Sequence, residues 1–150
     1  MSEFIVKKWP ALARGRGRCE LTMKHQIVAT DAAPKAIGPY SQAVWAGEIL
    51  FCAGQIPLDP TTGNMVTGGI TEQTTRVLKN IEGVLQSQGL NLSDVVKSTV
   101  FLSDLSHFTG MNEVYVRYFA KDAPARSTVQ VARLPKDALV EIEVIAVRRT

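Results

Sequence analysis

The hydrophobic period of this chain changes from two to about 3.6 and back, and the order of these changes restricts the fold. Strand-like runs come first, in "HQIVAT" and "AVWAGEILFCAGQI". A helical stripe, a strand in "VVKSTVFLS", a second helical stripe and the final strands "STVQVA" and "LVEIEVIAV" follow. Strands interrupted by only two helices predict the α+β class, with one mixed sheet and both helices on one of its faces.

The two helices and one hairpin are marked by local signals. Gly47 and Glu48 predict a hairpin turn between two strands. The first helix follows Thr71 and ends at Gly89, and its apolar stripe is Thr74, Val77, Leu78, Ile81, Val84 and Leu85. Asp104 can cap the second helix, whose expected buried face is Leu105, Phe108, Met111, Tyr115 and Tyr118.

The runs "ILFCA" and "VIAV" are apolar on both faces of the predicted sheet. Side chains alternate between the faces of a strand, so both faces need cover. The two helices cover only one of them. We therefore expect a sheet from another subunit to cover the second face, which makes the protein an oligomer.

Charge and length divide the chain into an extension and one domain. The net charge of the 150 residues is +3. Residues 1–23 hold five basic and two acidic side chains, so 5 − 2 accounts for all of it, and twelve of each sign remain in residues 24–150. We interpret residues 24–150 as a single neutral domain, which argues against strong nucleic-acid binding.

Residues 1–23 are expected to be a flexible N-terminal extension. Three origins stay open for "MSEFIVKKWPALARGRGRCELT": upstream or tag-derived sequence, an organelle-targeting segment, or an RNA-binding arm built on "RGRGR". Glu3 and Glu20 count against targeting, because such segments are poor in acidic residues. A cytoplasmic protein is the favoured interpretation.

Several kinds of chemistry lack their usual residues. No apolar run approaches the roughly 20 residues of a membrane helix. Cys19 and Cys52 suggest reduced thiols, and His25 and His107 lack further ligands at zinc spacing. The sequence holds no phosphate loop of the Walker type and no Gly-x-Ser-x-Gly elbow. We expect neither a metal nor a cofactor.

Arg126 opens a strand directly behind "APA" and is the first candidate site residue. A strand that fixes its Cα suits a bidentate grip on a small carboxylate, although a surface or ion-paired arginine is the alternative. Glu141 and Glu143 share one face of the last strand among apolar neighbours. Burial would raise the pKa of at least one and suit it to proton transfer. The alternative is a plain ion pair with Arg133 or Lys97.

The spacing of Arg126 and Glu141 sets a geometric condition. If "LPKDA" is a turn between two antiparallel strands, Glu141 lies opposite about Gln130. Arg126 is then four residues away, or roughly 13 Å at ~3.3 Å per residue. We therefore expect a working Arg–Glu pair to be completed between two chains.

Three further positions have a functional and a structural interpretation. Tyr40, in "IGPYSQA", is a proton donor or ligand-stacking phenol, or else an anchoring aromatic. Asn112 is a ligand-facing amide or a surface residue. Gly54 offers a backbone N–H to an anion or marks a strand-end bulge.

The motifs "IGPYSQAV", "AGQIPLDPTTG", "VVKSTVFLSDL" and "PARSTVQVARLPKDALVEIEVIAV" resemble the RidA/YjgF (L-PSP) family of reactive-intermediate deaminases over residues 24–150. This resemblance implies a chorismate-mutase-like fold assembled as a homotrimer, with a central β-barrel and ligand clefts between subunits. It also implies cofactor-independent hydrolysis of 2-imino or enamine acids to 2-oxo acids and ammonia, as by a 2-iminobutanoate/2-iminopropanoate deaminase. Endoribonuclease or translation-inhibitor activity, and a non-enzymatic role as an oxo-acid binder or holdase, are the alternatives.

The resemblance also assigns residues. Arg126 matches the arginine that binds the substrate carboxylate, and Glu141 matches the carboxylate that handles the attacking water. Tyr40, Asn112 and Gly54 match a cleft tyrosine, a cleft asparagine and a glycine whose backbone lines the site.

Two positions depart from the family pattern. Ala53 stands where many relatives have serine, so a hydroxyl contact with the substrate is lost. Thr128 replaces a frequent cysteine at a position where the family uses the backbone, so threonine should be tolerated. These two changes put the substrate preference in doubt.

Overall fold

The computed structural model describes residues 25–149, so the predicted extension at residues 1–23 lies outside the described residues. Six strands and two α-helices follow in the predicted order. They are β1 (Gln26–Val28), β2 (Ala43–Ala46), β3 (Ile49–Gln55), α1 (Ile70–Ser87), β4 (Val95–Leu102), α2 (Phe108–Tyr118), β5 (Ala125–Gln130) and β6 (Val140–Val147). Short 3₁₀ helices lie at η1 (Leu92–Asp94), η2 (Leu105–His107) and η3 (Pro135–Asp137).

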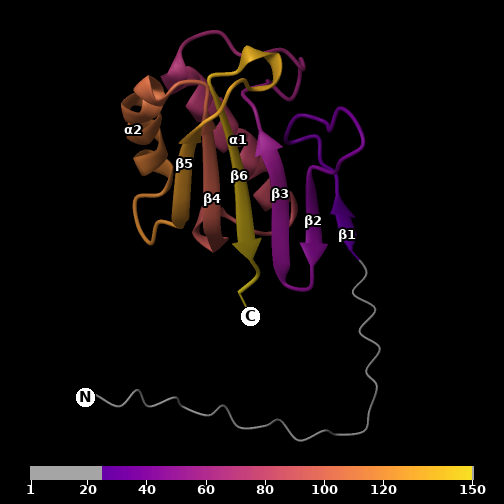
Figure 1. Cartoon of the computed structure of the whole chain (residues 1–150). Coiled ribbons are helices and arrows are strands. Elements are labelled where there is room, and N and C mark those ends of the chain that lie inside the picture. Colours follow the sequence, from indigo (N-terminus) through magenta and orange to yellow (C-terminus); the bar gives the residue numbers. More distant parts are fainter. Residues whose placement is uncertain (1–24, 150) are drawn as a thin grey trace, which may run out of the picture.

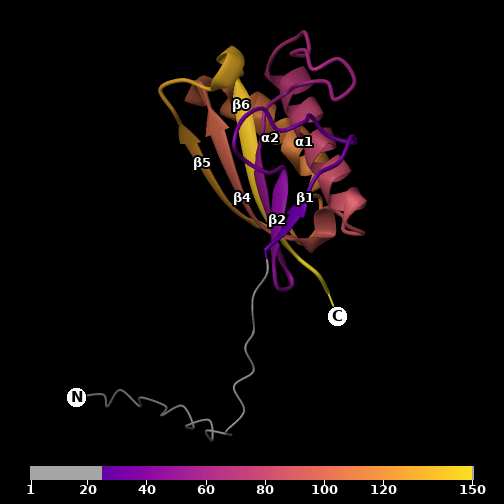
Figure 2. The same ribbon diagram turned by 90° about the vertical axis from the view of Figure 1, so that its right-hand side faces the viewer.

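The six strands form one sheet in the order β1-β2-β3-β6-β4-β5 (Figure 1). All neighbours are antiparallel except β4 and β5, which are parallel, so the sheet is mixed. Figure 2 shows both helices on the same side of this sheet. The predicted α+β class is confirmed, as is the hairpin at Gly47, where Ala46 faces Ile49 across the turn.

The predicted pairing of the last two strands is wrong. Glu141 lies opposite Phe101 of β4, and Phe101 in turn lies beside Val129 of β5. β4 therefore separates β5 from β6. The cause is α2, which returns the chain parallel to β4 and leaves β5 at the sheet edge; residues 131–139 then carry the chain past β4.

The core lies between the sheet and the helices. All six residues of the predicted α1 stripe are buried, which confirms this expectation. Burying each large apolar side chain contributes about 1.5–3 kcal/mol before other terms. On the sheet, the residues of β6 facing α1 are Val140, Ile142, Val144 and Ala146.

The buried face of α2 is partly different from the prediction. Leu105 and Phe108 are 50% and 39% exposed, whereas Met111, Val114 and Tyr115 are buried. The Asp104 carboxylate accepts from the Ser106 N–H and so caps the separate 3₁₀ turn η2. α2 starts only afterwards, and this break shifts which residues point inward.

The sheet face away from the helices carries exposed apolar side chains that none of the described residues cover. Ile27, Ile49, Phe51 and Val129 lie on this face by their register and are 69%, 39%, 46% and 44% exposed. The predicted cover by another subunit stays a prediction. No helix in the described part of the chain has the length and apolar character needed to cross a bilayer.

Candidate active site

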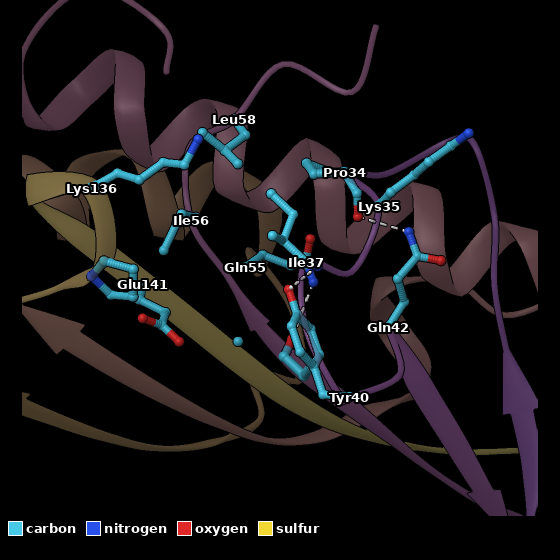
Figure 3. Close-up of a pocket in the computed structure, with 13 residues that line it drawn as sticks. Pro34, Lys35, Ile37, Tyr40, Gln42, Gln55, Ile56, Leu58, Lys136 and Glu141 are labelled. Carbon is cyan, nitrogen blue, oxygen red and sulfur yellow. Dashed lines mark hydrogen bonds between the residues drawn. The ribbon is translucent and has the colours of Figure 1, made fainter. Parts of the chain in front are cut away.

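A cavity of about 550 Å³ lies beside the start of β6 (Figure 3). Four of the seven predicted site residues line it, namely Tyr40, Ala53, Gly54 and Glu141. Lys35 and Lys136 also line the cavity. Much of the remaining wall is apolar and consists of Pro34, Ile37, Ile56, Leu58 and Pro135.

Glu141 is the acid of this cavity. Its side chain is half-buried, and burial raises the pKa of its carboxyl, with repulsion from Glu143 as a second cause. Within residues 25–149, no hydrogen bond or ion pair reaches its carboxylate. The predicted alternative pairings are not formed, because Arg133 pairs with Asp137 at 2.7 Å and Lys97 donates to the Ser127 hydroxyl at 2.7 Å.

Gly54 makes room for this carboxylate. The pairing of β3 with β6 shifts between Cys52 and Gln55, which is the bulge of the structural interpretation. A Cβ built on Gly54 would lie 2.0 Å from Glu141 Oε1 and 2.9 Å from its Cδ. Any side chain at this position would therefore displace the acid, so the glycine leaves the space that the Glu141 carboxylate occupies.

The loop that carries Tyr40 is held by Gln42. The buried Gln42 amide accepts from the Thr30 N–H at 2.6 Å and donates to the Pro34 carbonyl at 2.8 Å. The Tyr40 hydroxyl accepts from the Ile37 N–H at 3.3 Å, and its side chain is 53% exposed (Figure 3). A well-anchored loop thus presents a solvent-accessible phenol at the cavity. Sequence reasoning missed Gln42, although a buried amide is a common way to satisfy such a turn-rich loop.

A corner after β5 closes the cavity on another side. Lys136 and Asp137 both have left-handed backbone angles, with φ of 55° and 57°, a conformation that side chains disfavour. The Asp137 carboxylate accepts two hydrogen bonds from the Arg133 guanidinium, at 2.7 and 3.0 Å. Lys136 extends toward Leu58 (Figure 3). This lysine was also missed from the sequence.

Arg126 lies away from the cavity. It is the register partner of Ser98, and Ser98 is the partner of Val144, whose side chain is buried under the helices. Glu141 is three residues from Val144 and therefore points to the opposite face. Within one chain the predicted pair is thus separated by β4 and by the sheet itself.

The guanidinium of Arg126 lies against two aromatic rings. Its central carbon is 4.6 Å from the centroid of Tyr115 and 5.7 Å from that of Phe108. Among residues 25–149 it forms no ion pair or side-chain hydrogen bond. The sequence alternative of an ion-paired arginine is therefore not seen within the described chain.

The comparisons with known proteins agree with this fold. The family described as Endoribonuclease L-PSP matches residues 30–148. This chain belongs to the RidA/YjgF/L-PSP family. A RutC family protein of Pyrococcus horikoshii is 55% identical over 121 residues, which is 81% of this chain and 96% of that protein. The human protein named 2-iminobutanoate/2-iminopropanoate deaminase is 43% identical, over 82% of this chain and 90% of its own length.

A solved family structure has the same architecture. The crystal structure of E. coli TdcF with bound serine is 45% identical and superposes with a TM-score of 0.79, covering 83% of this chain and 99% of that one. The family assignment made from the sequence motifs is confirmed, and the relatives include proteins named as reactive-intermediate deaminases.

The two positions that depart from the family pattern have defined surroundings. The Ala53 N–H donates to the Gln42 carbonyl at 2.9 Å, so this backbone group is already used. Thr128 is the register partner of Val100, and its hydroxyl oxygen is buried without a hydrogen-bond partner among the described residues. Asn112 is half-buried on α2. Neither Thr128 nor Asn112 lines the cavity of Glu141.

Cys52 does not provide a nucleophile. It is a free cysteine, and burial raises the pKa of its thiol to about 12. Almost no thiolate exists at neutral pH under these conditions. Within residues 25–149, no three His, Cys, Asp or Glu side chains gather as a metal ion would require. Glu141 is the acidic side chain among the residues that line the cavity.

Proposed function

We propose that this protein hydrolyses small 2-imino acids, and the enamine acids that equilibrate with them, to 2-oxo acids and ammonia. The observation that carries the proposal is the half-buried Glu141 carboxyl, which lies in a cavity, has no partner among residues 25–149 and has a raised pKa. A raised pKa makes a carboxylate a better acceptor of a proton from water, and the same group can return the proton later. The activity named for the human relative supports the same chemistry.

The reaction needs one water molecule and three proton transfers. Glu141 takes a proton from water while the water oxygen bonds to the carbon of the protonated imine, which gives a neutral tetrahedral carbinolamine. The carboxylic acid then gives this proton to the nitrogen, which makes it a leaving group. The C–N bond breaks as the hydroxyl passes its proton to the departing ammonia and the C=O bond forms, so ammonium leaves and Glu141 is a carboxylate again for the next turnover. Tyr40, at the cavity mouth, exchanges the proton that interconverts enamine and imine.

The substrate carboxylate is bound by Arg126 of a neighbouring chain in this proposal. Arg126 and Glu141 face opposite sides of one sheet, so one chain cannot bring both to a small molecule. The uncovered apolar face supports assembly as a homotrimer with a central β-barrel. A bidentate grip on the carboxylate would hold the imine carbon beside the water that Glu141 activates.

The fixed backbone around the cavity completes the proposed site. Gly54 leaves space for the acid, and Thr128 and Asn112 join from the neighbouring chain together with Arg126. Imines already hydrolyse in water without a catalyst, so the barrier to be lowered is modest. Positioning and a single proton-transfer group therefore suffice, without a metal or cofactor in the proposed reaction.

The test generates imines enzymatically in the assay mixture and measures how much of the imine escapes hydrolysis. An amino-acid oxidase or a dehydratase releases the imine in the presence of semicarbazide, which traps what has not been hydrolysed. We expect the wild-type protein to lower the trapped product at catalytic concentrations and Arg126→Ala to lose this effect. If the wild type leaves trapping unchanged, or Arg126→Ala remains fully active, the proposed function is wrong.

The family description also names an endoribonuclease. We do not propose RNA cleavage for this chain, because residues 24–150 carry equal numbers of basic and acidic side chains. Strong binding to RNA depends on neutralising phosphates with Lys and Arg. RNA cleavage that depends on Arg126 and persists after removal of residues 1–23 would reverse this choice.

A further inference from the structure

We propose that Tyr115 is a positioning residue for Arg126: its ring, anchored through Ser98, holds the guanidinium in the plane that receives the substrate carboxylate. This inference rests on the proposed function and assigns it a residue outside the predicted site. It starts from the contacts of three side chains on β4, β5 and α2.

Tyr115 joins two neighbouring strands. Ser98 and Arg126 are register partners on β4 and β5, so their side chains stand next to each other on the same face. The Tyr115 hydroxyl shares a buried hydrogen bond of 2.7 Å with Ser98, and the face of its ring lies under Arg126 at 4.6 Å. One residue of α2 therefore contacts both strands at the same level.

The hydrogen bond fixes the ring more firmly than packing alone. Ser98 is fully buried and Tyr115 is only 5% exposed, so neither hydroxyl has water as a ready alternative partner. Buried polar groups that lose their partner are costly, which favours a single ring orientation. The Phe119 ring packs against Tyr115 with centroids 4.5 Å apart and restricts its movement further.

Stacking suits an arginine that has to bind an anion. An aromatic ring attracts a guanidinium through its face and makes contact with the flat side of the group. The N–H donors lie in the guanidinium plane, so stacking orients the fork without using any donor. An ion pair with a protein carboxylate would orient it too, but would occupy the donors that the substrate needs.

The surroundings of Arg126 fit this role. Within the described chain its guanidinium forms no ion pair, while the Phe108 ring lies 5.7 Å away and adds a weaker second contact. Phe108 is 39% exposed at the start of α2, and Arg126 itself is only half-buried, so part of the arginine is accessible. The fork is thus oriented, unoccupied by described residues, and placed at an edge strand.

The experiment measures carboxylate binding and the order of the arginine separately. The binding probe is 2-oxobutanoate, titrated against the assembled full-length protein. The Arg126 Nε–Hε NMR signal, assigned by its loss in Arg126→Ala, reports the stacking, because a proton above or below an aromatic ring resonates upfield. The variants are Tyr115→Leu, Tyr115→Phe and Phe108→Leu, with Tyr118→Leu as the matched control on α2.

Tyr115→Leu should weaken binding of 2-oxobutanoate about tenfold, which is the loss of one partly desolvated cation–π contact, and should leave kcat for bound substrate nearly unchanged. The upfield shift of the Arg126 signal should disappear. Tyr115→Phe keeps the ring and should weaken binding less than about threefold, because only the anchoring hydrogen bond is lost. Tyr118→Leu should change neither readout.

Some outcomes would overturn the inference. If Tyr115→Leu folds and binds like the wild type while Arg126→Ala does not bind, the positioning role of Tyr115 is wrong and the proposed function stands. If Arg126→Ala itself binds normally, the proposed function fails first. If Tyr115→Leu does not fold, Phe108→Leu provides the test, because Phe108 is partly exposed. This substitution should weaken binding about twofold and reduce the upfield shift of the Arg126 signal. Unchanged values would contradict the proposal that aromatic rings position Arg126.

Discussion

The two halves of the candidate site are held by the fold in opposite ways. Glu141 lies in a concave cavity that backbone features create, chiefly the bulge at Gly54 and the loop anchored by Gln42. Arg126 lies on an edge strand against the rings of Tyr115 and Phe108. Among residues 25–149, the half-buried acid has no hydrogen-bond or ion-pair partner, and the guanidinium keeps its donors free of side-chain partners.

This difference follows from what each group has to do. A proton-transfer carboxyl needs reduced hydration, because hydration holds its pKa at the ordinary value. A carboxylate-binding arginine needs free N–H donors and a fixed plane. If both groups shared one small pocket in a single chain, they would pair with each other. The sheet keeps them apart within one chain, and in the proposed function another chain supplies the missing partner.

Substitutions in the two halves should have different kinetic signatures, and this is the largest effect we expect. Glu141→Gln should lower kcat by about 10²–10⁴-fold, since it removes the proton-transfer group. Arg126→Lys should instead weaken binding of 2-oxo acids by about 100-fold, because an ammonium cannot form the bidentate fork. Initial rates with enzymatically generated imines, together with calorimetric titration of 2-oxobutanoate, separate these effects.

A reversed pattern would break the comparison. If Glu141→Gln abolishes binding of the oxo acid while the protein remains folded, the carboxyl has a structural role. If Arg126→Lys binds normally and only turns over slowly, the arginine acts on the chemical step.

Gly54→Ala should affect only the acid half, and less strongly. The added Cβ would meet Glu141 Oε1 at 2.0 Å, so the carboxylate has to move. A misplacement of about 1 Å can cost about 100-fold in rate, and we expect a fall in kcat of that order with oxo-acid binding retained. Gly69→Ala is the matched control, because its Cβ would find its nearest neighbour at 3.8 Å. Full activity in Gly54→Ala would show that the acid tolerates displacement.

The raised pKa of Glu141 also predicts a small effect on stability. Because the pKa is higher in the folded protein, the contribution of this group is fully present below the ordinary Glu pKa and is lost as the pH rises through the folded-state pKa. Glu141→Gln removes the buried charge, so it should raise Tm at pH 8 by about 2 °C, a small value because the carboxyl is still half-solvated.

Thermal unfolding at several pH values checks this sign. The gain in Tm should shrink toward pH 4 and be absent below it, where the wild-type carboxyl is protonated in both states. Glu143→Gln, at an exposed position on the same face of the strand, is the matched control. An equal gain in Tm for Glu141→Gln at pH 4 and pH 8 would mean that burial does not destabilise the ionised carboxylate.

Helices, strands and turns could be predicted from the sequence where they depend on the local residue pattern. The α1 stripe from Thr74 to Leu85 and the turn at Gly47 are local signals, and the structure confirms both. The pairing of β5 with β6 was wrong, because neighbours in a sheet depend on where α2 returns the chain. The buried face of α2 was partly wrong because a separate 3₁₀ turn precedes the helix.

The sequence predicted several residues of the candidate site, but not the contacts that hold them in place. The residues Tyr40, Gly54 and Glu141 share a cavity, although they come from separate segments. Neither Tyr115 nor Gln42 was found as a supporting residue. Their roles arise from contacts between distant segments, such as Tyr115 with Ser98, and no local spacing marks them.

The most direct test of the central claim, that each site needs two chains, mixes two inactive variants. Arg126→Ala and Glu141→Gln are produced together, and exchange of subunits is verified by native mass spectrometry. Random assembly places an intact Arg126 beside an intact Glu141 at about one boundary in four, so we predict recovery of about a quarter of wild-type activity. Mixed assemblies that remain as inactive as each variant alone would contradict the account.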